Sequence, residues 1–479
     1  MKRSLLLFAS FLLLMTGLTA QSGVRGRIAD KTGIDLPGAT IYVVQTETGT
    51  VTNDEANYEI TLEPGRYTLI YQYLGYGTVT ERVEIKEDTY VELDVRLPDE
   101  SNDLTTIEVY EGAEDPSYSV IRRAIAKADY HRLQVEKYTA RTYIKGTGRL
   151  KKYPKAARLL MSKEDRVYLD TTKAYSSEAV SEITFKRPND FSERVISIYE
   201  EGDARQTSPA RFIGSSFYQP EVWDGISPLN RRAFSYYRFE LDGYFLDRGR
   251  GVNKIKVTPR SRGDNVYEGY LYILEDTWSI HSLELTTYKM GIAFTMRQIY
   301  APVKDDIWMP VTSKVDANGK IYGFEFVYNY IATISDYVVE VNPDLPPYVE
   351  VIDEKTQPDE AAGAREVARA ARSQSIEDRL EANEKVTNKE LRRLMLEYQR
   401  EERREEKEEK KDEPVLTRNY SYKIDSTARE QDSLFWAAVR PVPLTSYEVR
   451  GYYLEDSIAK VDKIKEAGDT TSSGKLIVG

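Results

Sequence analysis

The sequence contains no cysteine and only two histidines among its 479 residues. The absence of cysteine excludes disulfide bonds, thiolate-ligated metal sites and a cysteine nucleophile. The chain also has no excess of basic residues, because its formal net charge at pH 7 is -11. An acidic balance of this kind gives no general electrostatic affinity for nucleic acid, so we expect no nucleic-acid partner.

Recognisable catalytic motifs are also absent. The chain has no G-x-S-x-G elbow, no Walker loop and no dinucleotide-binding fingerprint. His281 and Glu284 have the H-x-x-E spacing of zinc carboxypeptidases. Residues three apart on a strand point to opposite faces, however, and a second histidine ligand would have to be the distant His131. The sequence therefore predicts no catalytic residue, no metal ion and no cofactor.

Tyrosine is abundant instead. The chain has 36 tyrosines against 13 phenylalanines, and tyrosine suits the half-buried pleated surface of a β-sheet. The length allows roughly two to four domains. We therefore predict a mainly β protein with added helices.

Residues 1–20 have the pattern of a signal peptide. Lys2 and Arg3 precede the apolar run Leu5–Leu14, and the small residues Thr19 and Ala20 offer a cleavage point before Gln21. The run is short for a membrane-spanning helix. A retained anchor is the alternative, but the charged flank and the cleavage residues favour export.

Residues 21–98 show short strands separated by turns. Pro64-Gly65 opens a run in which Tyr67, Leu69, Tyr71 and Tyr73 alternate along one face. About seven strands at this spacing predict a small Greek-key β-sandwich. The segment resembles the carboxypeptidase-regulatory-like domain, a transthyretin-like sandwich. The resemblance implies a folding or binding accessory rather than a peptidase.

Residues 99–345 are predicted to form a large antiparallel sheet covered by a helix. Val120, Ile121, Ala124, Ile125 and Ala128 recur at helical spacing, which predicts a helix from Asp115 to Arg132. Many alternating strand runs follow, and Asp316-Ala317-Asn318-Gly319 between two of them has the composition of a hairpin loop. Consecutive strands with few helices between them favour an antiparallel sheet. The arrangement is similar to the half-open barrels of lipoprotein-carrier proteins.

The aromatic faces of this domain predict a ligand groove. One covering helix cannot shield all of them, and uncovered apolar surface marks binding sites. A solid core beneath the helix is the alternative. The predicted groove is lined by Tyr270, Tyr272, Phe324, Phe326 and Tyr328.

Residues 346–415 are dominated by charge and are predicted to be a helical or disordered linker. Ser375 with Asp378 and Thr387 with Glu390 have the spacing of helix capping boxes. Residues 416–479 follow as a segment with one helix, which Thr445 and Glu448 would cap.

Three stretches together resemble one family. They are the helix-to-strand stretch Asp115–Gly146, GYLYILEDTWSIHSLEL at Gly269–Leu285, and FWAAVRPVPLT at Phe435–Thr445. The family is an uncharacterised group of Gram-negative outer-membrane proteins that couples a carboxypeptidase-regulatory-like domain to a domain of unknown function. Its members continue into a membrane β-barrel. The resemblance therefore implies the periplasmic part of an outer-membrane protein, in a chain that is truncated before the barrel.

The leading hypothesis is a non-enzymatic cell-envelope protein that binds or scaffolds a lipid, a glycan or a protein. The alternative is a hydrolase that acts on envelope glycans or peptides through carboxylates that the sequence cannot single out. A pair of carboxyl groups facing each other across an open pocket would favour the alternative.

Overall fold

The structure is a computed structural model, which describes residues 22–46, 48–99, 114–161, 169–188, 190–200, 216–381, 385–409 and 420–451. The predicted signal peptide, residues 1–20, lies outside the described residues. None of the helices in this described part of the chain is both long and apolar enough to cross a membrane.

Eight short strands build the N-terminal domain. They form one sheet in the order β4-β1-β7, with β8 also paired to β1, and a second sheet in the order β3-β2-β5-β6. Alternate residues such as Ile28, Ile41 and Leu69 are fully buried in a core of their own. The predicted β-sandwich is confirmed. The bounds are β1 Gly23–Asp30, β2 Thr40–Val43, β3 Thr48–Val51, β4 Asn57–Thr61, β5 Gly65–Gln72, β6 Val79–Ile85, β7 Tyr90–Glu92 and β8 Val95–Leu97.

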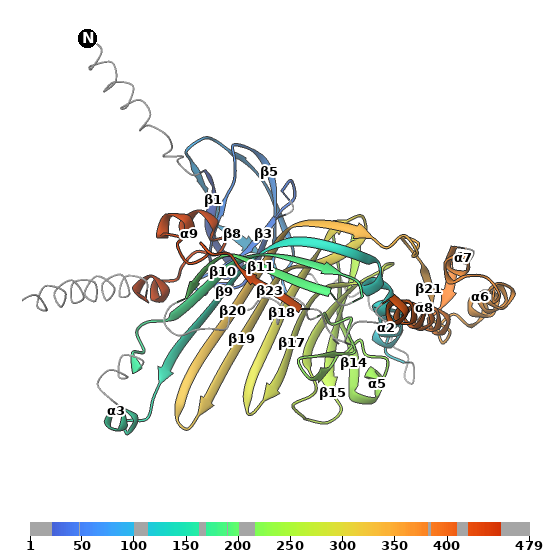
Figure 1. The fold of residues 1–479 in the computed structure, drawn as a ribbon. Coiled ribbons are helices and arrows are strands. Elements are labelled where there is room, and N and C mark those ends of the chain that lie inside the picture. Colours follow the sequence, from blue (N-terminus) through green and yellow to red (C-terminus); the bar gives the residue numbers. More distant parts are fainter. Residues whose placement is uncertain are drawn as a thin grey trace, which may run out of the picture.

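A single curved sheet dominates the second domain (Figure 1). Its order is β14-β15-β16-β17-β18-β19-β20-β9-β10-β11-β23. All pairs are antiparallel except β11 with β23, which is parallel. The bounds are β9 Val135–Lys152, β10 Tyr175–Lys186, β11 Asp190–Glu200, β14 Tyr237–Asp247, β15 Arg250–Pro259, β16 Glu268–Leu274, β17 Ile280–Lys289, β18 Ile292–Lys304, β19 Ile307–Ile321, β20 Phe324–Val341 and β23 Tyr420–Ile424. A two-stranded ribbon of β12 (Glu221–Val222) and β13 (Gly225–Ile226) and the short helices α3 (Ala157–Leu160) and α5 (Ala233–Tyr236) lie in its connections.

Helix α2, Ser117–Leu133, covers one end of this sheet. Pro116 is the N-cap residue of the helix, and Asp115 before it accepts a hydrogen bond from the backbone N–H of Ser117 at 2.9 Å. Ile121 and Ala124 are fully buried in the same core as the sheet residues Ile144 and Ile255. The helix predicted from the apolar spacing is therefore confirmed, and with it the predicted fold class.

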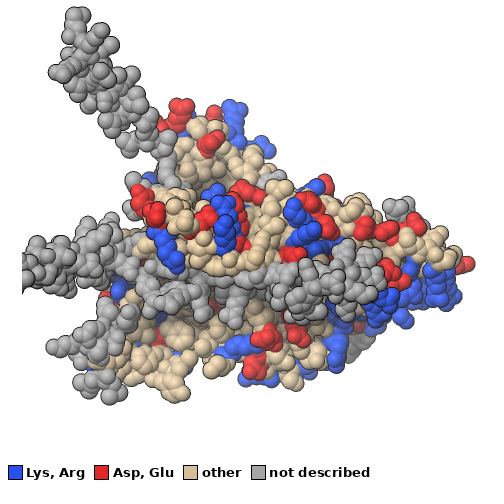
Figure 2. All heavy atoms as spheres, in the orientation of Figure 1, with Lys and Arg blue, Asp and Glu red and all other residues tan. Residues whose placement is uncertain are grey.

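A layer of further helices lies on the other side of α2. Tyr130 and Leu133 of α2 share a buried cluster with Leu391, Leu394 and Met395 of α8. The elements are β21 Glu350–Ile352, α6 Pro358–Ala370, α7 Ile376–Glu381, β22 Lys385–Thr387 and α8 Asn388–Glu409. Charged side chains crowd the surface at this end of the molecule (Figure 2). The described part of residues 346–415, a stretch predicted to be a charged helical or disordered linker, thus contributes packed helices to the fold, although its boundary as a domain stays a prediction.

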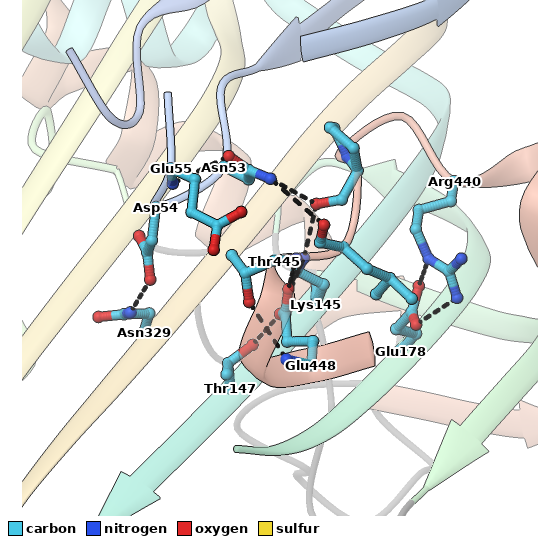
Figure 3. Close-up of polar contacts among 12 residues, drawn as sticks. Asn53, Asp54, Glu55, Lys145, Thr147, Glu178, Asn329, Arg440, Thr445 and Glu448 are labelled. Atoms are coloured by element: carbon cyan, nitrogen blue, oxygen red, sulfur yellow. Dashed lines mark hydrogen bonds and ion pairs between the residues drawn. The ribbon is translucent and has the colours of Figure 1, made fainter. Parts of the chain in front are cut away.

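Residues 440–448, here called the anchor segment, follow helix α9 (Ser433–Val439) and connect the two domains. Arg440 donates two hydrogen bonds of 2.8 Å to Glu178 of β10. Lys145 of β9 pairs with Glu448 at 2.9 Å. From the sandwich, Asn53 donates to the carbonyl of Pro443 at 3.2 Å (Figure 3). The anchor segment therefore holds the sandwich against β9 and β10.

One predicted turn is wrong. Strand β19 continues through Asp316–Gly319, and the chain reverses at Tyr322 and Gly323, where φ is 48° and 83°. A Cβ atom on Gly319 would lie 2.3 Å from the Phe326 ring. Gly319 is thus a strand residue that makes room for an aromatic ring, and not a turn residue.

Candidate ligand cavity

A cavity of about 210 Å³ lies where the C-terminal end of α2 and helix α8 meet the ends of the sheet strands. Each strand contributes an aromatic or apolar side chain because strand alternation points it to this face. The apolar lining includes Leu133, Val135, Tyr138, Phe185, Phe191, Tyr218, Tyr300, Trp308, Met309 and Tyr337. The polar lining includes His131, Arg132, Arg187, Gln399, Glu402 and Arg403.

Apart from Nε of Arg187, which lies in an ion pair with Glu136, three nitrogen donors of the lining have no hydrogen-bond partner among the residues that the structure describes. They are Nε of Arg132, Nε1 of Trp308 and Nε2 of Gln399, and all three atoms are buried. An unsatisfied buried donor costs about 1–3 kcal/mol. These donors come from α2, β19 and α8, so the fold brings together three groups that each require an acceptor.

Arg187 fixes positive charge in the cavity wall. It donates to the carbonyl of Leu133 at 3.0 Å and to the hydroxyl of Tyr398 at 2.9 Å. It also pairs with Glu136 at 3.1 Å and Glu402 at 3.3 Å. Burial alone would lower the pKa of Arg187, but Tyr398 and the two carboxylates raise it overall. The guanidinium therefore stays charged.

His131 lies beside the cavity as a neutral ring. Its Nε2 is 2.9 Å from the carbonyl oxygen of Thr277, and its Nδ1 is 3.2 Å from Gln134. Burial, together with the nearby charge of Lys127, lowers the pKa of His131 to about 3. His131 therefore carries no charge at neutral pH, and both of its ring nitrogens already have partners within the protein.

The other histidine belongs to a separate polar pair. Nε2 of His281 lies 3.2 Å from Oδ2 of Asp247, whereas Glu284 accepts a hydrogen bond from Arg297 at 2.7 Å. His281 and Glu284 thus have different partners. No group of three or more His, Asp or Glu side chains suited to a metal ion is found among the residues that the structure describes.

The five residues predicted to line one groove do not come together. Tyr272 is buried in the main core at 3% exposure, and Tyr270 packs against that core. Phe326 and Tyr328 line a second hollow of about 480 Å³ at the other end of the strands, which Phe324 does not line. The reason is sheet order: three strands separate β16 from β20, which places them roughly 19 Å apart.

Sequence reasoning missed the residues of the 210 Å³ cavity. Tyr337 lies in a β-bulge, because the pairing of β20 with β9 shifts between Ser335 and Val338. A bulge re-aims a side chain and often lies beside a binding site. Tyr138 and Trp308 lie far apart in sequence and near the α2 end of their strands. No local motif connects these residues, and only the topology of the sheet brings them together.

A β-sandwich joined to a large antiparallel sheet defines a two-domain, mainly β protein. Residues 24–109 match the model of the CarboxypepD_reg-like domain, and residues 120–337 match the family of unknown function DUF5686. The chain therefore carries these two domains one after the other, and the resemblance found in the sequence is confirmed.

A curated relative matches a smaller part of the chain. Over 99 residues the chain is 38% identical to the TonB-dependent receptor P39 of Formosa agariphila. This match covers 21% of the chain and only 9% of that receptor.

Solved structures resemble the chain weakly. A DUF1329 family protein from Desulfovibrio piger is 12% identical and covers 47% of this chain and 94% of its own, with a TM-score of 0.21. A LolA superfamily protein from Nitrosomonas europaea is 12% identical and covers 47% and 95%, with a TM-score of 0.19. Scores this low establish no common fold.

Proposed function

We propose that this chain is a non-enzymatic protein of the cell envelope that binds an amphiphile with an anionic head in the 210 Å³ cavity. The observation that carries the proposal is that three residues of the aromatic-walled lining, Arg132, Trp308 and Gln399, each have a buried nitrogen donor without a partner among the described residues. A carboxylate, phosphate or sulfate group accepts hydrogen bonds and donates none when fully ionised.

A glycan fits this lining less well. Sugar hydroxyls donate as well as accept, so a glycan site needs free acceptors. In the described part of the lining the only carboxylate is Glu402, which is paired with Arg187 at 3.3 Å. The unpaired groups are all donors, which favours a ligand that only accepts.

The volume favours a slender ligand. Pockets for drug-sized molecules usually enclose about 300–1,000 Å³, and they are mostly apolar with a few polar groups. The cavity of about 210 Å³ is smaller than this range. A single extended acyl chain with its head at the donors fits it better than a lipid with several chains.

The envelope location is supported by the relatives. A CarboxypepD_reg-like domain and a partial match to a TonB-dependent receptor favour an exported, outer-membrane-associated protein. The pattern of residues 1–20 favours the same location. We infer that the described domains face the periplasm.

The hydrolase alternative gains no support from three buried carboxyl groups, Asp247, Asp353 and Glu448. A general acid needs a raised pKa. The pKa values of Asp247, Asp353 and Glu448 are all below their ordinary values, because cationic or hydrogen-bonding partners outweigh the burial that would raise them. These carboxylates are held ionised, which suits structural ion pairs better than acid catalysis.

Binding of palmitate and of hexadecanol to the full chain tests the proposal. Gln399→Glu keeps the side-chain shape but replaces an unpaired donor by a negative charge. We expect palmitate affinity to fall at least tenfold, since hydrogen bonds to charged groups contribute about 1.5–3 kcal/mol. Hexadecanol affinity should change much less.

The matched control is Gln374→Glu, which adds the same charge at an exposed position. It should leave palmitate affinity unchanged. Absence of palmitate binding by the wild-type chain, or equal losses in the two variants, would refute the proposed site.

A further inference from the structure

Apolar side chains project from two hairpin turns at the end of the sheet away from α2. Met290 is 92% exposed and Tyr322 is 95% exposed, and Tyr288 and Ile321 beside them are also exposed. The turns lie on neighbouring hairpins, because β18 pairs with β19 from Ala293 onward. Contiguous exposed apolar groups of this kind mark a surface for a partner or a membrane.

Basic side chains flank these apolar groups. Lys320 and Lys152 lie 3.2 Å and 4.0 Å from one carboxylate, Glu325. Strand β9 ends beside the same hairpin, since a Cβ atom on Gly323 would lie 2.9 Å from Pro154. The β9 end adds the exposed cations Lys151 and Lys155, and the neighbouring turn adds Lys289. Two carboxylates also lie here, Glu325 and Glu268, and Glu268 accepts a hydrogen bond from the Tyr288 hydroxyl at 3.0 Å. Five lysines outnumber them, so this end is locally basic in a chain whose net charge is -11.

We propose that this strand-tip surface docks on a lipid bilayer that carries anionic headgroups. The surface is defined as Tyr288, Met290, Ile321 and Tyr322 with the lysines at positions 151, 152, 155, 289 and 320. Exposed tyrosine and aliphatic groups at a turn insert at the bilayer interface, and lysines around them pair with anionic headgroups. The lower left of Figure 2, where these hairpins end, shows mostly uncharged atoms at the very tips.

Other occupants fit the surface less well. Lysine is depleted in interfaces between proteins, whereas five lysines surround these four apolar residues. A second copy of the same surface would bring like charges together. Long lysine side chains suit a bilayer because they can bury their stems while their charged ends stay in the headgroup layer. The proposal does not depend on the cavity at the α2 end.

The absence of cysteine gives a direct test. Met290→Cys in the full chain creates a single thiol, which can carry an environment-sensitive fluorophore. Leu246→Cys is the matched control, because Leu246 is 66% exposed at the end of β14, where the sheet faces α2. Each labelled chain is mixed with vesicles of phosphatidylcholine alone or with phosphatidylglycerol added.

We expect a rise in emission at position 290 with the anionic vesicles, a much weaker rise with neutral vesicles, and none at position 246. Adding Tyr322→Asp to the labelled Met290→Cys chain should lower vesicle affinity at least tenfold. Lys155→Glu, at an exposed cation, should lower it by a smaller factor and leave the melting temperature unchanged.

No rise at position 290, equal rises at positions 290 and 246, or equal responses to both vesicle types would overturn the proposal. So would a response at position 290 to envelope proteins without lipid. Met290 and Tyr322 contact almost nothing in the folded chain, so loss of binding in these variants reports on the surface rather than on folding.

Discussion

Loss of the Glu448 carboxylate should strongly destabilise the junction between the two domains. Lys145 and Glu448 are only 3% and 2% exposed, and their charged atoms lie 2.9 Å apart. Glu448 also accepts from the backbone N–H of Thr445 at 2.6 Å and from the hydroxyl of Thr147 at 2.7 Å. Glu448→Ala leaves a buried ammonium without its counter-charge, which costs about 3–5 kcal/mol.

The same pair gives the stability a defined pH dependence. Burial raises the pKa of Glu448, but the charge of Lys145 and the hydrogen bonds outweigh it, so the pKa in the folded chain lies below its ordinary value. The folded chain therefore binds fewer protons than the unfolded chain near the unfolded pKa of about 4.3. The contribution is present above that pH and is lost as the pH falls through the folded pKa. Glu448→Gln should remove it.

Thermal unfolding of the full chain, followed by circular dichroism, measures the effect. The unfolding entropy is about 2.1 cal/mol/K per residue, so each kcal/mol shifts the melting temperature of a 479-residue chain by about 1 °C, and Glu448→Ala should lower it by about 3–5 °C. The control is Glu340→Ala. Glu340 pairs with Lys137 at 2.8 Å, but the two side chains are 59% and 37% exposed.

Exposed pairs contribute about 0–1 kcal/mol, so the control should melt close to the wild-type chain. The double variant Lys145→Met with Glu448→Leu should recover most of the loss, because it removes both buried charges. The reasoning fails if Glu448→Ala and Glu340→Ala shift the melting temperature by similar amounts.

Three further substitutions or truncations test the packing. Gly269→Ala should lower the free energy of unfolding by at least about 1–3 kcal/mol, because φ is 139° and a Cβ atom would lie 2.1 Å from the carbonyl oxygen of Glu284. The control is Gly363→Ala in helix α6, which should not lower the free energy of unfolding because the space around Gly363 is open. Burial lowers the pKa of Lys127 to about 7, so the unfolded chain binds more protons between pH 7 and about 10.4. Unfolding measured against pH should therefore show stability that rises over this window in the wild-type chain and not in Lys127→Met. A chain cut after Leu345 would expose the side of α2 that packs on α8, and we expect its thermal unfolding to lose cooperativity.

Local signals in the sequence predicted local structure well. The capping box of Thr445 and Glu448 is present, with reciprocal hydrogen bonds of 2.6 Å and 3.3 Å. Ser375 accepts from the backbone N–H of Asp378 at 3.1 Å at the start of α7, as its spacing indicated. These features depend on residues three apart, so the sequence contains all the information that they need.

The candidate site depended on information that is not local. The alternation of Tyr270 and Phe326 indicated which face each one occupies, but not that three strands lie between β16 and β20. The cavity requires α8. The charged C-terminal half of that helix dominated the sequence pattern, so the apolar residues near its start, Leu391, Leu394 and Met395, were not recognised as core residues. Tyr337 enters the cavity through a bulge, for which its sequence neighbours give no signal.

The length of the strands keeps the two proposed surfaces independent of each other. Tyr138 of β9 lines the cavity, and Lys152 of the same strand belongs to the strand-tip surface. The fourteen residue-to-residue steps of extended strand from Tyr138 to Lys152 span about 46 Å. Charges interact weakly beyond a Debye length of about 8–10 Å, so a charge added at Gln399 exerts no direct force at the tips. A change in vesicle binding caused by Gln399→Glu would therefore require the sheet itself to move, whereas unchanged binding would mean that one rigid sheet carries two separate sites.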